Sequence, residues 1–177
     1  MSFRISGGIS MRLFIAIHFS SEVKKILLSA IEELKQQTVS GNFTSPENLH
    51  LTLAFIGESE RVSEIRAAID RSADGPFEMA VSGTGRFGNV YWVGIEKNPK
   101  LKTLAESLQA ELRNSGFDIE NREFKPHITL ARQVEASAPI NLNVKRTAMF
   151  VSRVSLMKSE RINGRLRYTE IYGRNLP

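Results

Sequence analysis

The chain has 177 residues, of which 41% are hydrophobic, and its formal net charge is +5. This length supports one sizeable hydrophobic core. It contains no cysteine, which excludes disulfides, thiolate nucleophiles and cysteine-based zinc sites, and no apolar run approaches the roughly 20 residues that cross a bilayer. The positive charge favours a polyanionic partner such as RNA, although an ordinary basic surface explains it equally well.

The first ten residues differ from the rest of the chain. Residues 1–10 show little hydrophobic periodicity and lack the apolar core of a secretory signal. We therefore expect a flexible leader at 1–10 and a single folded domain over 11–177. With neither a secretory signal nor a membrane span in the sequence, a cytoplasmic protein is expected.

The first half of the domain predicts alternating strands and helices. Residues 13–17 form a short apolar run that is typical of a buried strand, and Ser20 or Ser21 can begin a helix. Apolar residues then recur on one helical face, at Val23, Ile26, Leu27, Ala30, Ile31 and Leu34. A polar loop leads into a strand over 50–57, and a second helix is predicted over 62–71.

The second half begins in a similar order. Strands rich in aromatic and β-branched residues are expected over 77–81 and 90–95, joined by a glycine-rich connection. Apolar spacing predicts a third helix from Leu101 to Leu112. Gly116 fits the position that ends this helix, because glycine adopts the left-handed conformation there easily.

The chain is predicted to end in a β-hairpin. Residues 151–158 and 167–172 alternate between apolar and polar side chains, and Asn163 with Gly164 favours a turn within their longer connection. Several arginines gather in this part of the chain: Arg153, Arg161, Arg165, Arg167 and Arg174. They either line a groove or solvate the hairpin.

One four-residue pattern occurs twice. Residues 50–53 are His-Leu-Thr-Leu, and residues 127–130 are His-Ile-Thr-Leu. Because side chains alternate along a strand, each histidine shares a face with its threonine while the aliphatic residues face the core. One imidazole can accept a proton while the other donates one, and two hydroxyls can bind an anion between them. This combination suits phosphodiester chemistry without a metal ion.

The spacing around the two copies indicates a weak internal repeat. One His-Thr strand alone would more often be structural than catalytic. However, Leu13 precedes His50 by 37 positions, and Val90 precedes His127 by the same 37 positions. The repeat predicts two similar lobes whose His-Thr strands face one another across a groove.

Other basic residues and one glycine motif lie near these strands. Arg132, close to the expected end of the second strand, is a candidate for holding a phosphate oxygen. Lys125 is interpreted as a solvated flank and His18, with no threonine two positions later, as a structural residue. Residues 83–88 match the Gly-x-Gly-x-x-Gly dinucleotide fingerprint but precede a strand rather than a helix, so we interpret them as a hairpin connection.

The paired motifs resemble the 2H phosphoesterase superfamily, and within it the RNA 2′,3′-cyclic phosphodiesterases, also called 2′-5′ RNA ligases. The resemblance rests on residues 48–53, on residues 55–57 after them and on residues 125–132, and it extends from Met11 nearly to the end. It implies an α+β fold of two intertwined, pseudo-symmetric lobes. Antiparallel sheets would line a central groove, with helices packed outside.

The resemblance also implies a reaction. A 2′,3′-cyclic phosphate at an RNA end would be hydrolysed to a 2′-phosphate without a metal or another cofactor. His50 would donate a proton to the departing 3′ oxygen, and His127 would activate water. Thr52 and Thr129 would bind the nonbridging phosphate oxygens with the help of Arg132. The expected partners are RNA ends of this kind, tRNA fragments among them, or cyclic nucleotides, and the expected state is a monomer.

Other activities stay open at this point. One is the reverse reaction, 2′-5′ ligation of RNA ends, and another is hydrolysis of a small cyclic or 2′-5′-linked nucleotide. A third is a binding module that holds an RNA end or a nucleotide without turnover, against which the intact histidines and threonines of both copies argue. The two motifs are so alike that their residues do not by themselves assign the acid and the base.

Overall fold

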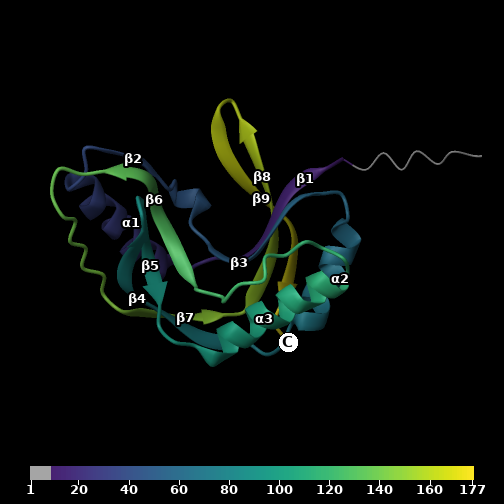
Figure 1. Cartoon of the computed structure of the whole chain (residues 1–177). Helices are drawn as coiled ribbons and strands as arrows, with labels where there is room; N and C mark the ends of the chain where they lie inside the picture. The colour runs from purple at the N-terminus through teal and green to yellow at the C-terminus, as the bar shows by residue number, and fades with distance from the viewer. Residues whose placement is uncertain (1–8) are drawn as a thin grey trace, which may run out of the picture.

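The computed structural model describes residues 9–177, so residues 1–8 of the predicted leader lie outside the described part. The described chain forms two antiparallel sheets (Figure 1). The four-stranded sheet has the order β3-β1-β8-β9, with bounds Leu51–Ser59, Met11–Ile17, Arg153–Ile162 and Arg165–Asn175. The five-stranded sheet has the order β2-β6-β5-β4-β7, with bounds Ser40–Phe43, His127–Glu135, Val90–Ile95, Phe77–Phe87 and Thr147–Val151. The predicted α+β class with antiparallel sheets is confirmed.

The helices begin and end close to the predicted positions. Residues 9–177 contain helices α1, α2 and α3, with bounds Ser21–Gln36, Val62–Ser72 and Pro99–Asn114, and a short 3-10 helix η1, Pro46–Asn48. The Ser20 hydroxyl accepts a hydrogen bond from the Val23 amide at 3.3 Å, and the Asn98 side chain accepts one from the Leu101 amide at 3.0 Å. Each cap satisfies an amide that the helix itself leaves free, which stabilises a helix by about 1 kcal/mol.

The chain exchanges helices between the two sheets. Helix α1 follows β1 of the four-stranded sheet, yet its buried stripe packs on β6 and β7 of the five-stranded sheet. Helix α3 follows β5 of the five-stranded sheet, yet it packs on β3 of the other sheet and on α2. Figure 1 shows α1 on the side of β2 and β6, with α2 and α3 on the opposite side of the molecule. Each core is therefore built from both halves of the sequence.

No α-helix within residues 9–177 combines the length and the apolarity needed to cross a membrane.

Most of the glycine-rich segment at 83–88 belongs to a strand, and only Gly88 lies in the connection. Strand β4 continues to Phe87, and the turn to β5 consists of the next two residues. Gly85 lies beneath the Trp92 ring, where a Cβ atom would come within 2.3 Å of the ring carbons. The predicted hairpin is confirmed, but its connection is shorter than predicted, because glycine makes room for the cross-strand indole instead of ending the strand.

The C-terminal hairpin is also longer than predicted. Strands β8 and β9 pair as far as Ile162 and Arg165, so that Asn163 and Gly164 alone form the turn. Both have positive φ, 51° and 76°, as a two-residue hairpin turn of this kind requires. The tip of this hairpin projects beyond the rest of its sheet (Figure 1). Two short strands, β2 and β7, were not predicted, because neither has a clear apolar alternation.

Candidate active site

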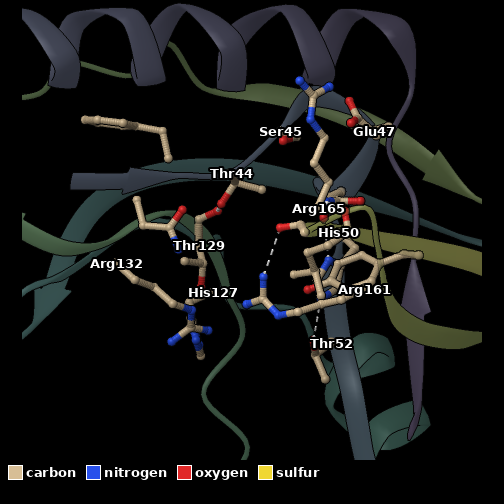
Figure 2. Close-up of a pocket in the computed structure, with 16 residues that line it drawn as sticks. Thr44, Ser45, Glu47, His50, Thr52, His127, Thr129, Arg132, Arg161 and Arg165 are labelled. Atoms are coloured by element: carbon tan, nitrogen blue, oxygen red, sulfur yellow. Dashed lines mark hydrogen bonds between the residues drawn. The ribbon is translucent and has the colours of Figure 1, made fainter. Parts of the chain in front are cut away.

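All five side chains singled out in the sequence line one pocket of about 450 Å³. His50 directly precedes β3 and Thr52 lies at its start, while His127, Thr129 and Arg132 come from β6. Figure 2 shows the two strands presenting these side chains to the same space. The remaining walls are residues 42–48, around β2 and η1, and the tip of the β8–β9 hairpin. The pocket therefore joins the two sheets at the repeated motif.

The aliphatic residues of each motif hold the strands in place. Leu51 and Leu53 of β3 are at most 1% exposed, and they pack in the core beneath α2 and α3. Ile128 and Leu130 of β6 are fully buried in the core beneath α1. The predicted alternation is confirmed, and it leaves the polar members of each motif facing the pocket.

A β-bulge brings Arg132 to the pocket. The pairing of β6 with β5 skips Leu130, because Thr129 and Ala131 pair with consecutive residues of β5. Leu130 and Ala131 are both buried, as expected where two residues of one strand oppose one residue of the next. Without this extra residue Arg132 would point away from the face of His127 and Thr129. The sequence placed Arg132 near the end of the strand, but β6 continues beyond it to Glu135.

Strand β3 contains the same bulge at the matching position. Its pairing with β1 skips Leu53, because Thr52 and Ala54 pair with consecutive residues of β1. Leu53 and Ala54 are both buried. Phe55 therefore occupies in β3 the position that Arg132 has in β6, and 51% of its side chain is exposed. The two halves match through this region except for an aromatic ring in place of a guanidinium.

Each histidine ring is fixed by a backbone carbonyl two residues before it. His50 Nδ1 donates a hydrogen bond to the Asn48 carbonyl at 2.7 Å, and His127 Nδ1 donates one to the Lys125 carbonyl at 2.8 Å. In a neutral ring this leaves Nε2 without a proton and able to accept one. Nε2 of His50 accepts a hydrogen bond from the Thr52 hydroxyl at 2.9 Å.

The two rings have different aromatic neighbours. The His50 ring lies between Phe14 and Tyr168, with centroid distances of 4.8 and 5.2 Å. The His127 ring meets the edge of Phe87, at 5.1 Å, which is itself 48% exposed. His50 is thus enclosed between strand β1 and the β8–β9 hairpin, whereas His127 lies at a more open end of the pocket.

This enclosure lowers the pKa of His50. Burial is the largest cause, because it disfavours the charged imidazolium, and the positive charges of His18, Arg132 and His127 act in the same direction. The hydrogen bond to the Asn48 carbonyl opposes them. In the free protein at neutral pH, His50 is therefore predominantly neutral, with Nε2 accepting from Thr52.

Several functional candidates were missed or left open by the sequence. Asn48 is 6% exposed, and its side-chain amide donates to the Leu166 carbonyl at 3.0 Å while its own carbonyl holds His50. It therefore connects the hairpin to the His50 ring. Arg161 and Arg165 of the hairpin line the pocket. Of the two alternatives left open for the late arginines, these two therefore line a groove. Their clustering in sequence was the signal.

His18 and Lys125 also have definite places. The Nε2 atom of His18 lies 3.3 Å from the Met157 sulfur, and His18 does not line the pocket. Lys125 contributes its backbone carbonyl to His127 rather than a side-chain contact. Over residues 9–177 no group of three His, Asp or Glu side chains is arranged to hold a metal ion.

Comparison with known proteins assigns the family. The model of the 2′-5′ RNA ligase superfamily matches residues 24–163. The chain belongs to this superfamily. A relative named RNA 2′,3′-cyclic phosphodiesterase from Thermotoga maritima is 40% identical over 131 residues, which cover 69% of this chain and 70% of the relative. The Escherichia coli protein of the same name is 30% identical over 165 residues, covering 90% and 93%.

A solved structure has the same architecture. Escherichia coli LigT complexed with 3′-AMP superimposes with a TM-score of 0.83 at 29% identity, covering 95% of this chain and 99% of LigT. The resemblance to the 2H phosphoesterases inferred from the sequence is therefore confirmed for both family and fold.

Proposed function

We propose that this superfamily member is an RNA 2′,3′-cyclic phosphodiesterase that leaves a 2′-phosphate. The main support is that two His-Thr pairs, from β3 and β6, face one pocket with both Nδ1 atoms held by backbone carbonyls. This arrangement leaves both Nε2 atoms for proton transfer. Relatives at 40% and 30% identity carry the same activity in their names.

The reaction needs one proton acceptor, one proton donor and donors to the phosphate oxygens. His127 accepts a proton from the attacking water as its oxygen bonds to phosphorus. The bond from phosphorus to the 3′ oxygen breaks, and His50 supplies the proton that this oxygen takes up. The 2′ ester is untouched, so the product is a 2′-phosphate. Each well-placed acid or base contributes about 10²- to 10⁴-fold to the rate.

Thr52, Thr129 and Arg132 bind the nonbridging oxygens of the phosphate. Their hydroxyl and guanidinium groups donate to oxygens whose negative charge grows as water adds. Protonation of His50 removes the acceptor of the Thr52 hydroxyl, because Nε2 then carries the proton that goes to the 3′ oxygen. The Thr52 hydroxyl hydrogen becomes free for the phosphate, so substrate binding and protonation of His50 support each other.

The lowered pKa of His50 in the free protein is compatible with a donor role. A bound phosphodiester carries one negative charge, which offsets the positive charge of Arg132, one of the causes that lower this pKa. Substrate binding therefore raises the pKa of His50 toward its ordinary value. Binding of the anionic substrate thus favours the protonated form of His50, which is the form that donates.

The proposed substrates are RNA chains that end in a 2′,3′-cyclic phosphate, tRNA fragments among them, and cyclic mononucleotides. The proposed location is the cytoplasm, and the proposed working unit is a monomer because one chain carries both His-Thr pairs. Ligation of a 5′-hydroxyl to a cyclic phosphate would be the reverse of the same reaction. Dilute solution favours hydrolysis, since water greatly exceeds RNA ends.

The product identifies the reaction. We expect purified protein in EDTA to convert an RNA oligomer with a 2′,3′-cyclic phosphate end to the 2′-phosphate, resolved from the 3′-phosphate by chromatography against both standards. A 3′-phosphate product would contradict the placement of the leaving oxygen. Substrate that binds without turnover would favour a nucleotide-binding module instead.

A further inference from the structure

A second groove opens from the catalytic pocket. This β1 groove, of about 890 Å³, is lined by Arg12 and Phe14 of β1, Phe55 of β3, and Lys158 and Arg161 of β8, among others. It shares several residues with the catalytic pocket, namely His50, Thr52, Arg132, Arg161, Leu166 and Tyr168. From the His-Thr pairs, the surface is therefore hollowed in two directions. The β1 groove includes His50, Thr52 and Arg132 but not His127 or Thr129, so most of it lies outside the reacting centre.

The β1 groove contains an exposed aromatic ring. The bulge in β3 turns Phe55 outward, and 51% of its side chain is exposed although the Arg12 guanidinium lies 4.9 Å from the ring centroid. Unlike other exposed phenylalanines such as Phe150, Phe55 lies in a groove that also contains His50 and Thr52, so its ring is within reach of a nucleotide that extends from the pocket. Aromatic rings stacked against nucleobases are the usual means by which proteins hold single-stranded RNA.

The charge of the β1 groove fits a nucleic-acid backbone. Arg12, Arg132, Lys158 and Arg161 line it, against the carboxylates Glu58 and Glu160. Among residues 9–177, eight ion pairs tie lysines and arginines to carboxylates, and Lys158 with Glu160 is one of them. Arg12 and Arg132 take part in none of these eight. An excess of positive charge therefore remains beside Phe55.

The chemistry of the substrate requires a path of this kind. The terminal ribose holds the cyclic phosphate on its 2′ and 3′ oxygens, and the rest of the RNA continues from its 5′ oxygen. We propose that the β1 groove binds the nucleotide on the 5′ side of the terminal one, with its base on Phe55 and its phosphodiester near Arg12. This inference rests on the proposed function. Its consequence is a preference for RNA over cyclic mononucleotides.

The test compares two substrates with the same reacting end. One is a 2′,3′-cyclic mononucleotide, and the other is a dinucleotide that ends in that same nucleotide. In Phe55→Leu, kcat/KM for the dinucleotide falls by about 5- to 150-fold, the range for loss of one base stack. Turnover of the mononucleotide is unchanged, which also shows that the pocket is intact.

Two further variants sharpen the test. Phe150→Leu is the matched control, because Phe150 is a 63% exposed phenylalanine on β7 that does not line the groove. It leaves both substrates unaffected. Arg12→Gln lowers kcat/KM for the dinucleotide alone and weakens its dependence on salt, because one cation near the phosphodiester is removed.

The outcomes separate the groove from the catalytic proposal. An equal fall for both substrates in Phe55→Leu would mean that Phe55 contacts the terminal nucleotide, and no fall for either would mean that it stacks no base; each overturns the inference. If the unaltered protein hydrolyses neither substrate, the proposed function fails instead. Calorimetry with the 2′-phosphorylated mono- and dinucleotides then still tests the groove, which requires Phe55→Leu to weaken binding of the dinucleotide only.

Discussion

Strands β3 and β6 present the same chemistry in two different surroundings. Each carries a histidine held by the carbonyl two residues before it, a threonine on the same face and a bulge directly after that threonine. The differences lie around them. His50 is enclosed by Phe14 and Tyr168, whereas His127 borders the more exposed Phe87. Local sequence therefore sets the geometry of each ring, and the packing around His50 lowers its pKa.

The largest expected effect comes from removing either ring. His50→Ala and His127→Ala should each lower kcat on a cyclic-phosphate RNA by about 10²- to 10⁴-fold, because each removes one proton-transfer group. Steady-state kinetics measure this, with circular dichroism to confirm the fold. His18→Ala is the matched control, since His18 lies outside the pocket, and it should retain activity. Comparable losses in all three variants would break the distinction between the two pocket histidines and His18.

The second largest effect is expected at the position after the bulge, which is Arg132 in β6 and Phe55 in β3. Arg132→Gln should lower kcat/KM by about 10- to 100-fold for mononucleotide and RNA alike, because a hydrogen bond from a charged donor to the phosphate is lost. Phe55, at the matching position of β3, should affect only the longer substrate. If Arg132→Gln, like Phe55→Leu, impaired only the longer substrate, the assignment of Arg132 to the cyclic phosphate and of Phe55 to the preceding base would be wrong.

The β6 half also depends on a close fit behind its histidine. Gly85→Ala would place a Cβ atom within 2.3 Å of the Trp92 ring, which must then move. We expect a loss of about 1–3 kcal/mol in the free energy of unfolding, measured by urea denaturation. Because Trp92 lies against Phe87, which contacts His127, activity should fall as well. Unchanged stability would show that the indole moves aside without cost.

The smallest effect is the pH dependence that His50 adds to stability. Its pKa is lowered in the folded protein, so the unfolded chain binds more protons than the folded one between that lowered pKa and about 6.5. Stability from this group is complete above pH 6.5 and is lost as the pH falls through this window. In His50→Gln the free energy of unfolding, measured by urea denaturation, should change less between pH 7 and pH 5 than in the unaltered protein. An identical change would show that His50 is not the source of this pH dependence.

The charge of Arg132 contributes to that lowering and can be measured separately. In Arg132→Gln the pKa of His50 should rise, because a positive charge that disfavours the imidazolium is removed. Nuclear magnetic resonance titration of the ring protons reports this directly, with His18 as an internal reference. A constant pKa of His50 would mean that the charge of Arg132 does not contribute to its lowering.

Much of this site follows from the sequence, because a strand has a fixed period. His50, Thr52, His127 and Thr129 share one pocket since the aliphatic residues between them must be buried. The place of Arg132 did not follow, because a bulge changes which face a residue takes and depends on pairing with β5. The role of Asn48 in joining η1 to the hairpin depends on contacts between residues 118 positions apart, which periodicity does not report.

The fold was predictable to a similar extent. Helices with a clear apolar stripe were found nearly to the residue, whereas the short edge strands β2 and β7 carry too little pattern. The segment around Gly85 was assigned to a connection because glycine usually interrupts strands. Only the Trp92 ring above it, from a neighbouring strand, explains why glycine belongs there.

The central claim is that the β3 half donates the proton and the β6 half accepts one. It is tested most directly with a substrate whose 3′ bridging oxygen is replaced by sulfur, because a thiolate departs without being protonated. His50→Ala should then recover most of its lost rate relative to the unaltered protein, and His127→Ala should not. Recovery by His127→Ala would reverse the two roles, and recovery by neither would contradict proton donation to the leaving group.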